Sequence, residues 1–334
     1  MLGKKRSSFA FLVITFNHRD YIVEHLESIK YLVKTYGSDI DVDLIVSDDC
    51  SLDNTSLLVD QWCVLNKSLF RSVETIYNKN NLGTCASVAN MLSLMAADHC
   101  KITAGDDVYS FQNIFEIANY STNVAILSGR PLYLLGNKLA LDAVSNSLAT
   151  ATQVIYEYDS LYHRFKHFSI NNAPNILYAT DCLLNQGVQE YLRRFDVTED
   201  WPLQVAIARY YPDRKFQLVD QVFVYYRRTL GSTYIVANQR FVRDKIKIYE
   251  DLIHHEDSLI EKIRLASRKI CFKINNRWLN KLLNIDFYFF ALSMAWNMQA
   301  IAAQNKLICI CVSEHQLHYD KIKEKAAAFL RQLD

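Results

Sequence analysis

The chain has 334 residues, of which 50% are apolar and 22% are charged, and it contains only 8 Gly and 4 Pro. This composition excludes a collagenous, low-complexity or predominantly disordered chain and provides enough apolar residues for a sizeable core. The 37 basic and 36 acidic residues give a formal net charge of +1, so no global field attracts nucleic acid. We therefore expect a globular protein without a nucleic-acid partner.

The first hundred residues alternate between apolar runs and helical periodicity. A continuous apolar run at 9–16 is typical of a strand buried on both faces, and apolar residues of 22–36 recur at helical spacing. The same criteria predict strands at 42–47, 72–77 and 100–104 and helices at 55–65 and 84–97. This alternation predicts a parallel sheet covered by helices, with ligands bound beyond the carboxyl ends of the strands.

The pattern becomes less regular after residue 120. It includes apolar pieces at 124–128 and 131–135, a polar stretch to about residue 175, a helix-like segment at 201–210 and a strand-like run from Phe216 to Tyr226. From about residue 236 onward Pro and Gly are absent, which predicts successive helices. We therefore expect an α/β domain over residues 1–235 and a helical C-terminal region over residues 236–334.

Two apolar segments bear on the cellular location. The run at 9–16 is followed by Asn17 and by no small-residue cleavage site, so we interpret it as a strand and not as a signal peptide. The apolar stretch at 287–303 is shorter than the roughly 20 residues that a spanning helix needs. The eight cysteines lack zinc-binding spacing and are interpreted as reduced and mostly buried. These features predict a cytoplasmic protein.

A first polar cluster follows the second predicted strand and contains Asp48 and Asp49. The Asp, Ser and Asn residues of this segment would serve any turn between a strand and a helix, which is one interpretation. The other interpretation is base recognition, because a carboxylate can accept a hydrogen bond from the imide N–H of a uracil.

Two further acidic clusters follow along the chain. Asp106 and Asp107 end the fourth predicted strand, and adjacent carboxylates repel unless a cation lies between them and a phosphate. A solvated turn is the alternative interpretation. Glu199 and Asp200 precede the helix-like segment at 201–210, so Asp200 can cap that helix, act as a general base whose pKa Glu199 tunes, or serve in both roles.

Together these segments resemble the family 2 glycosyltransferases, which are inverting sugar-nucleotide enzymes with the GT-A fold. The matching segments are TFN (15–17), SDDCSLDNT (47–55), NKNNLG (78–83), AGDDV (104–108), TEDW (198–201) and YYRRTLGS (225–232). They occur in the order found in the family. The resemblance implies an α/β protein with a Rossmann-like mixed sheet of the GT-A type, covered by helices and followed by the C-terminal helical region.

The resemblance also implies roles for individual residues. Asp48 and Asp49 would lie beside the uridine of a UDP-sugar donor, and Asp106 and Asp107 would bind Mn or Mg and the diphosphate. Asp200, beside Glu199, would be the general base at the acceptor hydroxyl. Further donor-binding positions implied by the motifs are Thr15, Asn17, Asn81, Gly83, Arg227, Arg228 and Ser232, the last three closing over the diphosphate or the acceptor.

The sequence departs from the family pattern at three positions. Cys50 replaces the Gly that usually follows the Asp pair, Ala89 stands where an Arg often precedes Asn90, and Ala104 replaces the first acid of a DxD motif. The last departure makes a non-catalytic sugar-nucleotide or glycan-binding module on the same fold the alternative to an enzyme. A nucleotidyltransferase would be expected to carry a GxxxxGK phosphate loop after the first strand, and the sequence has none there.

For the enzyme, the resemblance implies direct displacement at the anomeric carbon without a covalent nucleophile. The acceptor would be a glycan or a lipid-linked glycan, because the similarity extends to bacterial enzymes that build capsules and O-antigens. The cluster of seven basic residues and no acidic residue at 262–285 suggests where such an enzyme would meet an anionic membrane. Lys269 and Lys273 lie four apart, and Ile270 and Ile274 lie on an adjoining side, as in an interfacial helix on the inner face of the membrane. A solvated basic face packed on the catalytic domain is the alternative.

Overall fold

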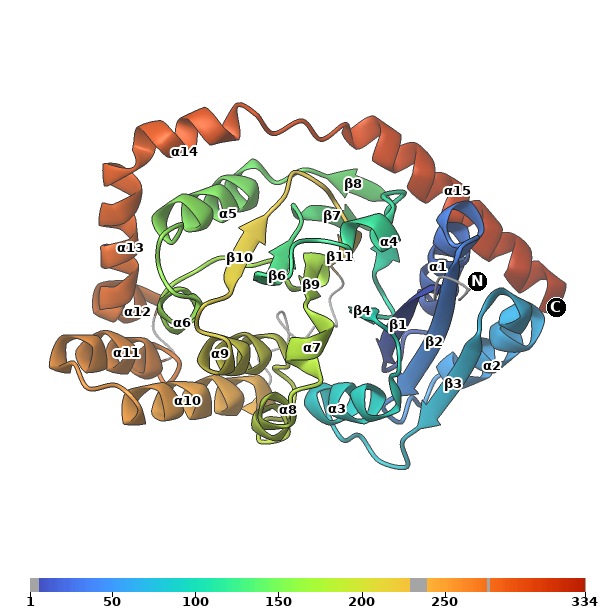
Figure 1. The fold of residues 1–334 in the computed structure, drawn as a ribbon, viewed down its shortest axis with the longest axis horizontal. Coiled ribbons are helices and arrows are strands. Elements are labelled where there is room, and N and C mark those ends of the chain that lie inside the picture. The colour runs from blue at the N-terminus through green and yellow to red at the C-terminus, as the bar shows by residue number, and fades with distance from the viewer. Residues whose placement is uncertain (1–5, 229–238, 275–276, 334) are drawn as a thin grey trace, which may run out of the picture.

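The computed structural model describes residues 6–228, 239–274 and 277–333 (Figure 1). Its first part contains a parallel sheet with the strand order β3-β2-β1-β4. The strands are β1 (Ser7–Thr15), β2 (Ile40–Asp48), β3 (Ser72–Tyr77) and β4 (His99–Ala104), and the helices between them are α1 (Ile22–Tyr36), α2 (Thr55–Asn66) and α3 (Thr84–Leu94). Every element predicted for the first 104 residues is present, although the helix predicted to reach residue 97 ends at Leu94.

Both faces of this sheet are buried, as the continuous apolar run predicted. Phe9, Phe11 and Val13 pack in one core with α1 and α2, while Leu12 and Ile14 pack in a second core with α3. The alternation follows from the two-residue period of a strand. The parallel register pairs Thr15 with Asp48 and Ile14 with Ala104, so the polar segments after three strands reach the same edge of the sheet.

The following part is mixed α/β structure around two smaller sheets, with strand orders β10-β6-β9 and β5-β11-β7-β8. The strands are β5 (Val108–Tyr109), β6 (Val124–Ser128), β7 (Leu132–Leu135), β8 (Lys138–Ala140), β9 (Ile176–Tyr178), β10 (Lys215–Leu218) and β11 (Val224–Arg227). The single strand predicted for 216–226 is therefore two strands, because β10 pairs with β6 and β11 pairs with β7 in a different sheet. Asp220 lies between them and forms an ion pair with Arg130.

Six helices occupy the middle of the chain. They are α4 (Ile114–Ile117), α5 (Ala143–Ile155), α6 (Leu161–Lys166), α7 (Thr180–Leu183), α8 (Gln186–Leu192) and α9 (Asp200–Tyr210), and short 3-10 helices occur at Lys67–Leu69 and Ala173–Asn175. The polar stretch to residue 175 thus contains α5 and α6. Asp142 and Ser160 accept hydrogen bonds from backbone N–H groups at the starts of these helices, so their N-caps are formed as expected for such residues.

The remainder of the described chain is helical, as predicted. The helices are α10 (Gln239–His254), α11 (Leu259–Cys271), α12 (Arg277–Leu283), α13 (Ile285–Trp296), α14 (Met298–Asn305) and α15 (Val312–Leu333). They run around the α/β part and return to its first helix, where α15 lies against α1 (Figure 1). Ile248 of α10 and Phe329 of α15 belong to the two cores of the sheet, whereas Phe290 of α13 and Ile301 of α14 pack in a smaller core with α5.

Two apolar segments differ from their expected form. The stretch at 287–303 is divided between α13 and α14, and none of the described helices is both long and apolar enough to cross a membrane. The cysteines are not mostly buried, because four of the eight are buried, while Cys309 and Cys311 are exposed. The apolar run around these two residues lies on the surface between α14 and α15 and does not form a core element.

Candidate active site

A cavity of about 1600 Å³ opens at the carboxyl edge of the parallel sheet. Its walls come from the strand ends, the segment at 167–178, the start of α9 and the helices α10 and α11. Among the residues predicted to form the site, those that line it are Asn17, Asp49, Asn81, Gly83, Asp106, Asp107, Glu199, Asp200, Arg227 and Arg228. The structure therefore brings residues of all six motifs to one cavity.

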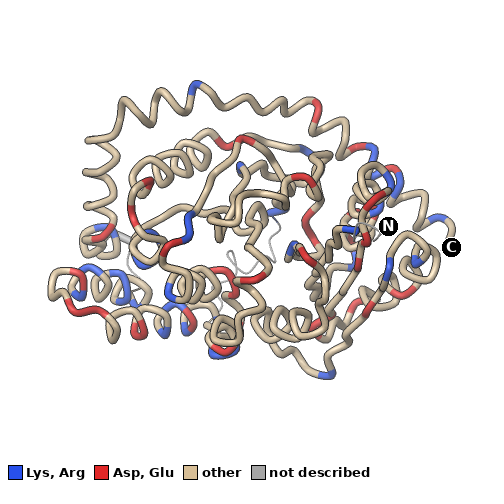
Figure 2. Tube along the Cα trace, in the orientation of Figure 1, with Lys and Arg blue, Asp and Glu red and all other residues tan. Residues whose placement is uncertain are grey.

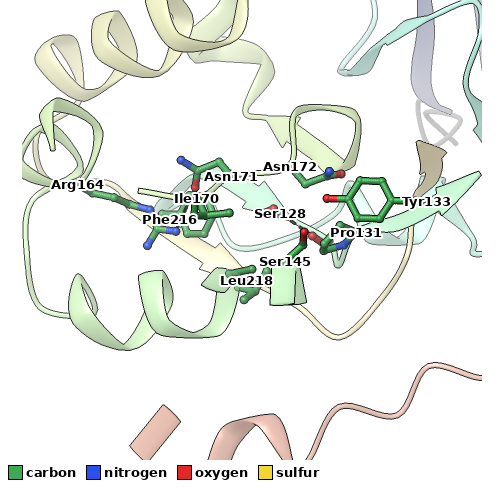
Figure 3. Close-up of a pocket in the computed structure, with 12 residues that line it drawn as sticks. Ser128, Pro131, Tyr133, Ser145, Arg164, Ile170, Asn171, Asn172, Phe216 and Leu218 are labelled. Atoms are coloured by element: carbon green, nitrogen blue, oxygen red, sulfur yellow. Dashed lines mark hydrogen bonds between the residues drawn. The ribbon is translucent and has the colours of Figure 1, made fainter. Parts of the chain in front are cut away.

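A smaller pocket of about 40 Å³ adjoins this cavity, and both share Tyr133, Ser145 and the segment at 170–172 (Figure 3). Arg164 lies at its far end, where the guanidinium carbon is 3.5 Å from the ring centre of Phe216. Burial lowers the pKa of Arg164 to about 9. The pocket is too small for a sugar and has room for a water molecule.

The two carboxylates of the first acidic cluster, Asp48 and Asp49, have different contacts. Asp48 accepts hydrogen bonds from the backbone N–H and the hydroxyl of Ser51 and does not line the cavity. Asp49 lines the cavity and accepts hydrogen bonds from the backbone N–H groups of Leu82, at 2.7 Å, and Gly83, at 2.8 Å. The turn interpretation therefore describes Asp48, whereas Asp49 links the end of β2 to the loop that carries Gly83.

The backbone of this cluster shows why the family usually has Gly at the position of Cys50. Cys50 has φ of +68°, in the left-handed region that favours glycine, and it occupies the position where the family usually has Gly. Asn17, also with φ of +54°, accepts a hydrogen bond from the backbone N–H of Leu52 at 2.9 Å and lines the cavity. Thr15 is buried, does not line the cavity, and its hydroxyl has no hydrogen-bond partner.

The loop of Asn81 and Gly83 is held from the C-terminal helices. Gly83 has φ of +88°, and a Cβ there would lie 2.3 Å from the backbone oxygen of Asp196, so only glycine fits. Arg240 of α10 donates to the carboxylate of Asp196 and to the side-chain oxygen of Asn81. The donor-binding positions implied at Asn81 and Gly83 thus depend on an Arg that lies outside the family motifs.

The second acidic cluster is not a solvated turn. Asp107 is buried and accepts a hydrogen bond from the backbone N–H of Arg227 at 2.9 Å. Burial, and then the adjacent carboxylate of Asp106, raise the pKa of Asp107 well above its ordinary value. The Asp106 side chain is 14% exposed and lines the cavity, with Nε2 of His18 3.9 Å away.

This donor set fits a divalent cation. Mg²⁺ and Mn²⁺ prefer carboxylate oxygens, and Asp106 presents its carboxylate to the cavity. A cation beside Asp106 would also offset the repulsion between the two adjacent carboxylates. The sequence-based assignment of the metal to Asp106 and Asp107 therefore remains a prediction that the geometry accommodates.

The arginines after β11 have different surroundings. Arg227 is buried, its Nε donates to the backbone oxygen of Asp106 at 2.6 Å, and it forms an ion pair with Glu24. Arg227 thus fixes the acidic turn while one face lines the cavity. Arg228 is exposed, with its guanidinium carbon 3.8 Å from the ring centre of Tyr133. Ser232 lies outside the described residues.

The third acidic cluster places two carboxyl groups with different pKa values in the cavity. Asp200 is the first residue of α9, and Glu199 is its N-cap without a side-chain capping bond, so the capping interpretation of Asp200 is wrong. Burial raises the pKa of Asp200 to about 6, an effect that Lys245 and Lys101 oppose. Burial, and then Asp200, raise the pKa of Glu199 well above its ordinary value. With a pKa of about 6, the Asp200 carboxyl is mostly ionised near neutral pH.

The sequence analysis did not assign a role at the site to four further residues. Asp244 accepts hydrogen bonds from the backbone N–H groups of three consecutive residues, 196–198, at distances of 2.8–3.2 Å, and so holds the loop before Asp200. Lys101 is buried within β4, and burial lowers its pKa to about 8. A charged residue inside a predicted buried strand was the available signal for Lys101. Asp244, and also Lys245 and Arg268, carry no local signal because their partners lie far away in the sequence.

A separate cluster joins α6 to the C-terminal helices. The ligand atoms of His163, His167 and Glu261 lie within 4.8 Å of one another, and Nδ1 of His167 is 2.9 Å from the carboxylate of Asp286. Lys166 and Arg264 form ion pairs with Glu261 at 3.1 and 2.9 Å. Because these cations already neutralise its carboxylate, the cluster is an ion-pair network that fixes α11 and α13 on α6. The predicted metal residues are not part of it.

The basic segment at 262–285 does not present one uniform basic face. Lys and Arg of α10 and α11 alternate with Asp and Glu in space (Figure 2). Lys269 lies 3.7 Å from Glu250, Arg264 pairs with Asp286, and Arg268 lines the cavity. The apolar side of the segment is exposed instead, with Trp278 at 81%.

Comparisons with known proteins bear on the family and the fold. Residues 10–134 match the family model "Glycosyl transferase family 2". The resemblance deduced from the motifs is therefore confirmed for this part of the chain. The sequence is also 26% identical over 194 residues to abequosyltransferase RfbV of Salmonella typhimurium, a match that covers 57% of this chain and 53% of that protein. The chain thus spans about half the length of this curated relative.

Solved structures with the same fold include two glycosyltransferases. The crystal structure of S. aureus TarS 1-349 has a TM-score of 0.55 at 14% identity and covers 98% of this chain and 92% of that chain. TarS 1-349 in complex with UDP-GlcNAc has the same TM-score and covers 96% and 92%. The mannosyltransferase PcManGT from Pyrobaculum calidifontis, in complex with GDP-Man and Mn2+, has a TM-score of 0.53 at 13% identity and covers 97% and 88%. These likenesses confirm the predicted GT-A-type fold.

Proposed function

We propose that the protein is an inverting glycosyltransferase that moves a sugar from a nucleotide-sugar, a UDP-sugar in our assignment, to a hydroxyl of a glycan or lipid-linked acceptor. The observation that carries the proposal is the convergence of Asp106 and Asp200 on one cavity at the carboxyl edge of the sheet. The Asp106 carboxylate suits a cation. The Asp200 carboxyl has a pKa of about 6, close to the pH at which a general base works best.

The reaction is a single displacement at the anomeric carbon. The Asp200 carboxylate takes the proton of the acceptor hydroxyl, the acceptor oxygen forms a bond to that carbon, and the bond to the diphosphate breaks on the opposite face. A divalent metal, held by Asp106 with Asp107 behind it, would supply charge neutralisation for the departing nucleoside diphosphate. Burial, and then the neighbouring Asp200, raise the pKa of Glu199 well above its ordinary value, and we assign the role of base to Asp200 alone.

The donor end of the cavity is the part next to the strand ends. Asp49, Asn17 and the Asn81–Gly83 loop line it there, and in our assignment they hold the nucleotide. UDP remains a sequence-based choice, which the complex of TarS with UDP-GlcNAc supports as an example on the same fold. Similarity to an abequosyltransferase supports a role in surface polysaccharide synthesis.

We further propose that α11, α12 and α13 face an anionic membrane surface. Several large apolar side chains on these helices are exposed: Leu259, Ile260, Ile263, Ile270, Trp278, Leu282 and Leu292. Exposed apolar area of this extent marks an interaction surface, and Lys262, Lys273 and Lys281 lie along the same segment. Docking there would bring the cavity to a lipid-linked acceptor.

The test of the proposed function is a panel of UDP-, GDP-, dTDP- and CDP-sugars, each with Mn or Mg. Thermal stabilisation by one donor and its slow hydrolysis, both dependent on the metal, are expected. Stabilisation without any hydrolysis, and without transfer to glycan acceptors, would support the non-catalytic binding module instead. A protein that no nucleotide-sugar stabilises would contradict both.

A further inference from the structure

Two cationic side chains line the cavity without a carboxylate partner. Lys245 of α10 and Arg268 of α11 take part in none of the ion pairs found among the described residues, whereas Arg264 and Lys269 on the same α11 helix both do. Their contacts are aromatic or neutral. The Lys245 ammonium lies 4.6 Å from the ring centre of Trp201, and Arg268 donates from Nε to the hydroxyl of Tyr249 at 3.0 Å.

These two cations belong to one wall of the cavity. The rings of Trp201 and Tyr249 are 4.8 Å apart and nearly perpendicular, so Lys245 and Arg268 flank an adjoining aromatic pair. Phe272 extends this surface, with its ring centre 5.9 Å from that of Tyr249. A wall of aromatic faces between two positive groups can stack against sugar rings and hold an anion beside them.

The unpaired charges need an explanation because a charge that is partly removed from water is costly. A cation removed from water without a partner loses much of its hydration energy. The same burial lowers the pKa of Lys245 to about 8, against the opposing effect of Asp200. An anionic ligand that reached both groups would restore the missing partner.

The position of this wall within the cavity indicates which substrate would carry the anion. Trp201 follows Asp200 directly in α9, so the wall adjoins the general base and not the strand ends assigned to the donor. Resting on the proposed function, we propose that Lys245 and Arg268 bind a phosphate ester of the acceptor, close to the hydroxyl that Asp200 deprotonates. The acceptor is then a phosphate-bearing glycan, either lipid-linked or free.

The experiment measures the affinity of this wall for a phosphate ester while the donor site is occupied. The protein is saturated with UDP and Mg, and sn-glycerol 3-phosphate is titrated by ligand-observed NMR, with glucuronate as the carboxylate probe. We expect K245M and R268Q each to weaken glycerol phosphate at least 10-fold and to leave UDP affinity unchanged. K245R should still bind glycerol phosphate. Arg243 is an exposed residue on the same α10 helix, so R243Q should bind glycerol phosphate like the unchanged protein.

The outcomes separate this inference from the proposed function. If K245M and R268Q no longer bind UDP but still bind glycerol phosphate, then the two cations hold the donor diphosphate, and the inference is wrong. Unchanged glycerol phosphate affinity in both variants, or binding of glucuronate alone, would also overturn it. A protein that binds glycerol phosphate as described but no nucleotide would contradict the proposed function while leaving the anion site in place.

A comparison of acceptors then distinguishes the source of the phosphate. A short polyprenyl monophosphate and sn-glycerol 3-phosphate carry the same phosphomonoester group but differ in the lipid chain. Tighter binding of the polyprenyl compound to the unchanged protein, lost in R268Q, would identify a lipid-linked acceptor. Equal affinities for the two compounds would identify a free phosphorylated glycan.

Discussion

Replacing Asp200 by Asn should remove activity and at the same time stabilise the protein. Burial raises the pKa of Asp200 from 3.8 to about 6, so the folded protein carries a carboxylate that would be ionised more easily in the unfolded chain. A difference of about 2 pH units corresponds to about 3 kcal/mol above pH 6, at about 1.4 kcal/mol each. Because the Asn amide also loses water in the cavity, the expected gain is about 1 to 3 kcal/mol.

The sign of this effect depends on pH. A carboxyl whose folded pKa is raised favours folding below its ordinary pKa, and this contribution is lost as pH rises through the folded value. Asp200→Asn should therefore gain stability over the unchanged protein above pH 6 and lose that advantage below about pH 4. Urea denaturation at pH 4, 5.5 and 7.5 measures it. Transfer at pH 7.5 should fall about 100-fold or more, while donor affinity stays the same.

A single result would refute the reasoning. If Asp200→Asn is less stable than the unchanged protein at pH 7.5, then the carboxylate makes favourable contacts that outweigh its burial, and the argument from burial for its role as a base is wrong. Normal transfer with normal stability would exclude the base assignment as well. The pH dependence of transfer gives an independent check, because activity in the unchanged protein should rise with an inflection near pH 6.

Three further outcomes are expected. Asp106→Asn should abolish the metal dependence of donor stabilisation without unfolding the protein, and unchanged metal dependence would contradict the metal assignment. Asp244→Asn should lower the transfer rate at least 10-fold with unchanged donor affinity, because an amide cannot accept all the N–H groups of residues 196–198; loss of donor affinity would place its effect elsewhere. Co-sedimentation should show binding to anionic but not neutral liposomes, weakened by high salt and by Trp278→Ser, and binding that ignores lipid charge would refute the membrane proposal.

The first sheet was predictable because its signals are local. A strand buried on both faces needs a continuous apolar run, and the helices between the strands need apolar residues at helical spacing, so each element could be recognised without its neighbours. The run at 216–226 failed this test for a physical reason. It is apolar enough for one strand, but its two halves pair with different sheets, and the pairing depends on β6 and β7.

The candidate site was predictable only where its residues follow strands or precede a helix. Asp49, Asp106 and Asp200 occupy such positions, and all three line the cavity. Lys245 and Arg268 lie within amphipathic helices, where position along the helix does not reveal which charged residue faces the α/β part. Arg268 appeared in the sequence as one of seven similar basic residues, and only the packing of α11 separates it from the others.

The C-terminal helices support the site at two separate points, which changes the meaning of the predicted division at residue 235. At one end, Asp244 of α10 holds the loop that presents the general base. At the other end, the hydroxyl of Tyr319 in α15 donates a hydrogen bond to Glu24 at 3.1 Å. Glu24 forms an ion pair with Arg227, and the backbone N–H of Arg227 donates a hydrogen bond to Asp107 in the acidic turn. A chain ending at residue 235 would lose both supports. The composition changes there because strands give way to helices, whereas the active site requires both parts.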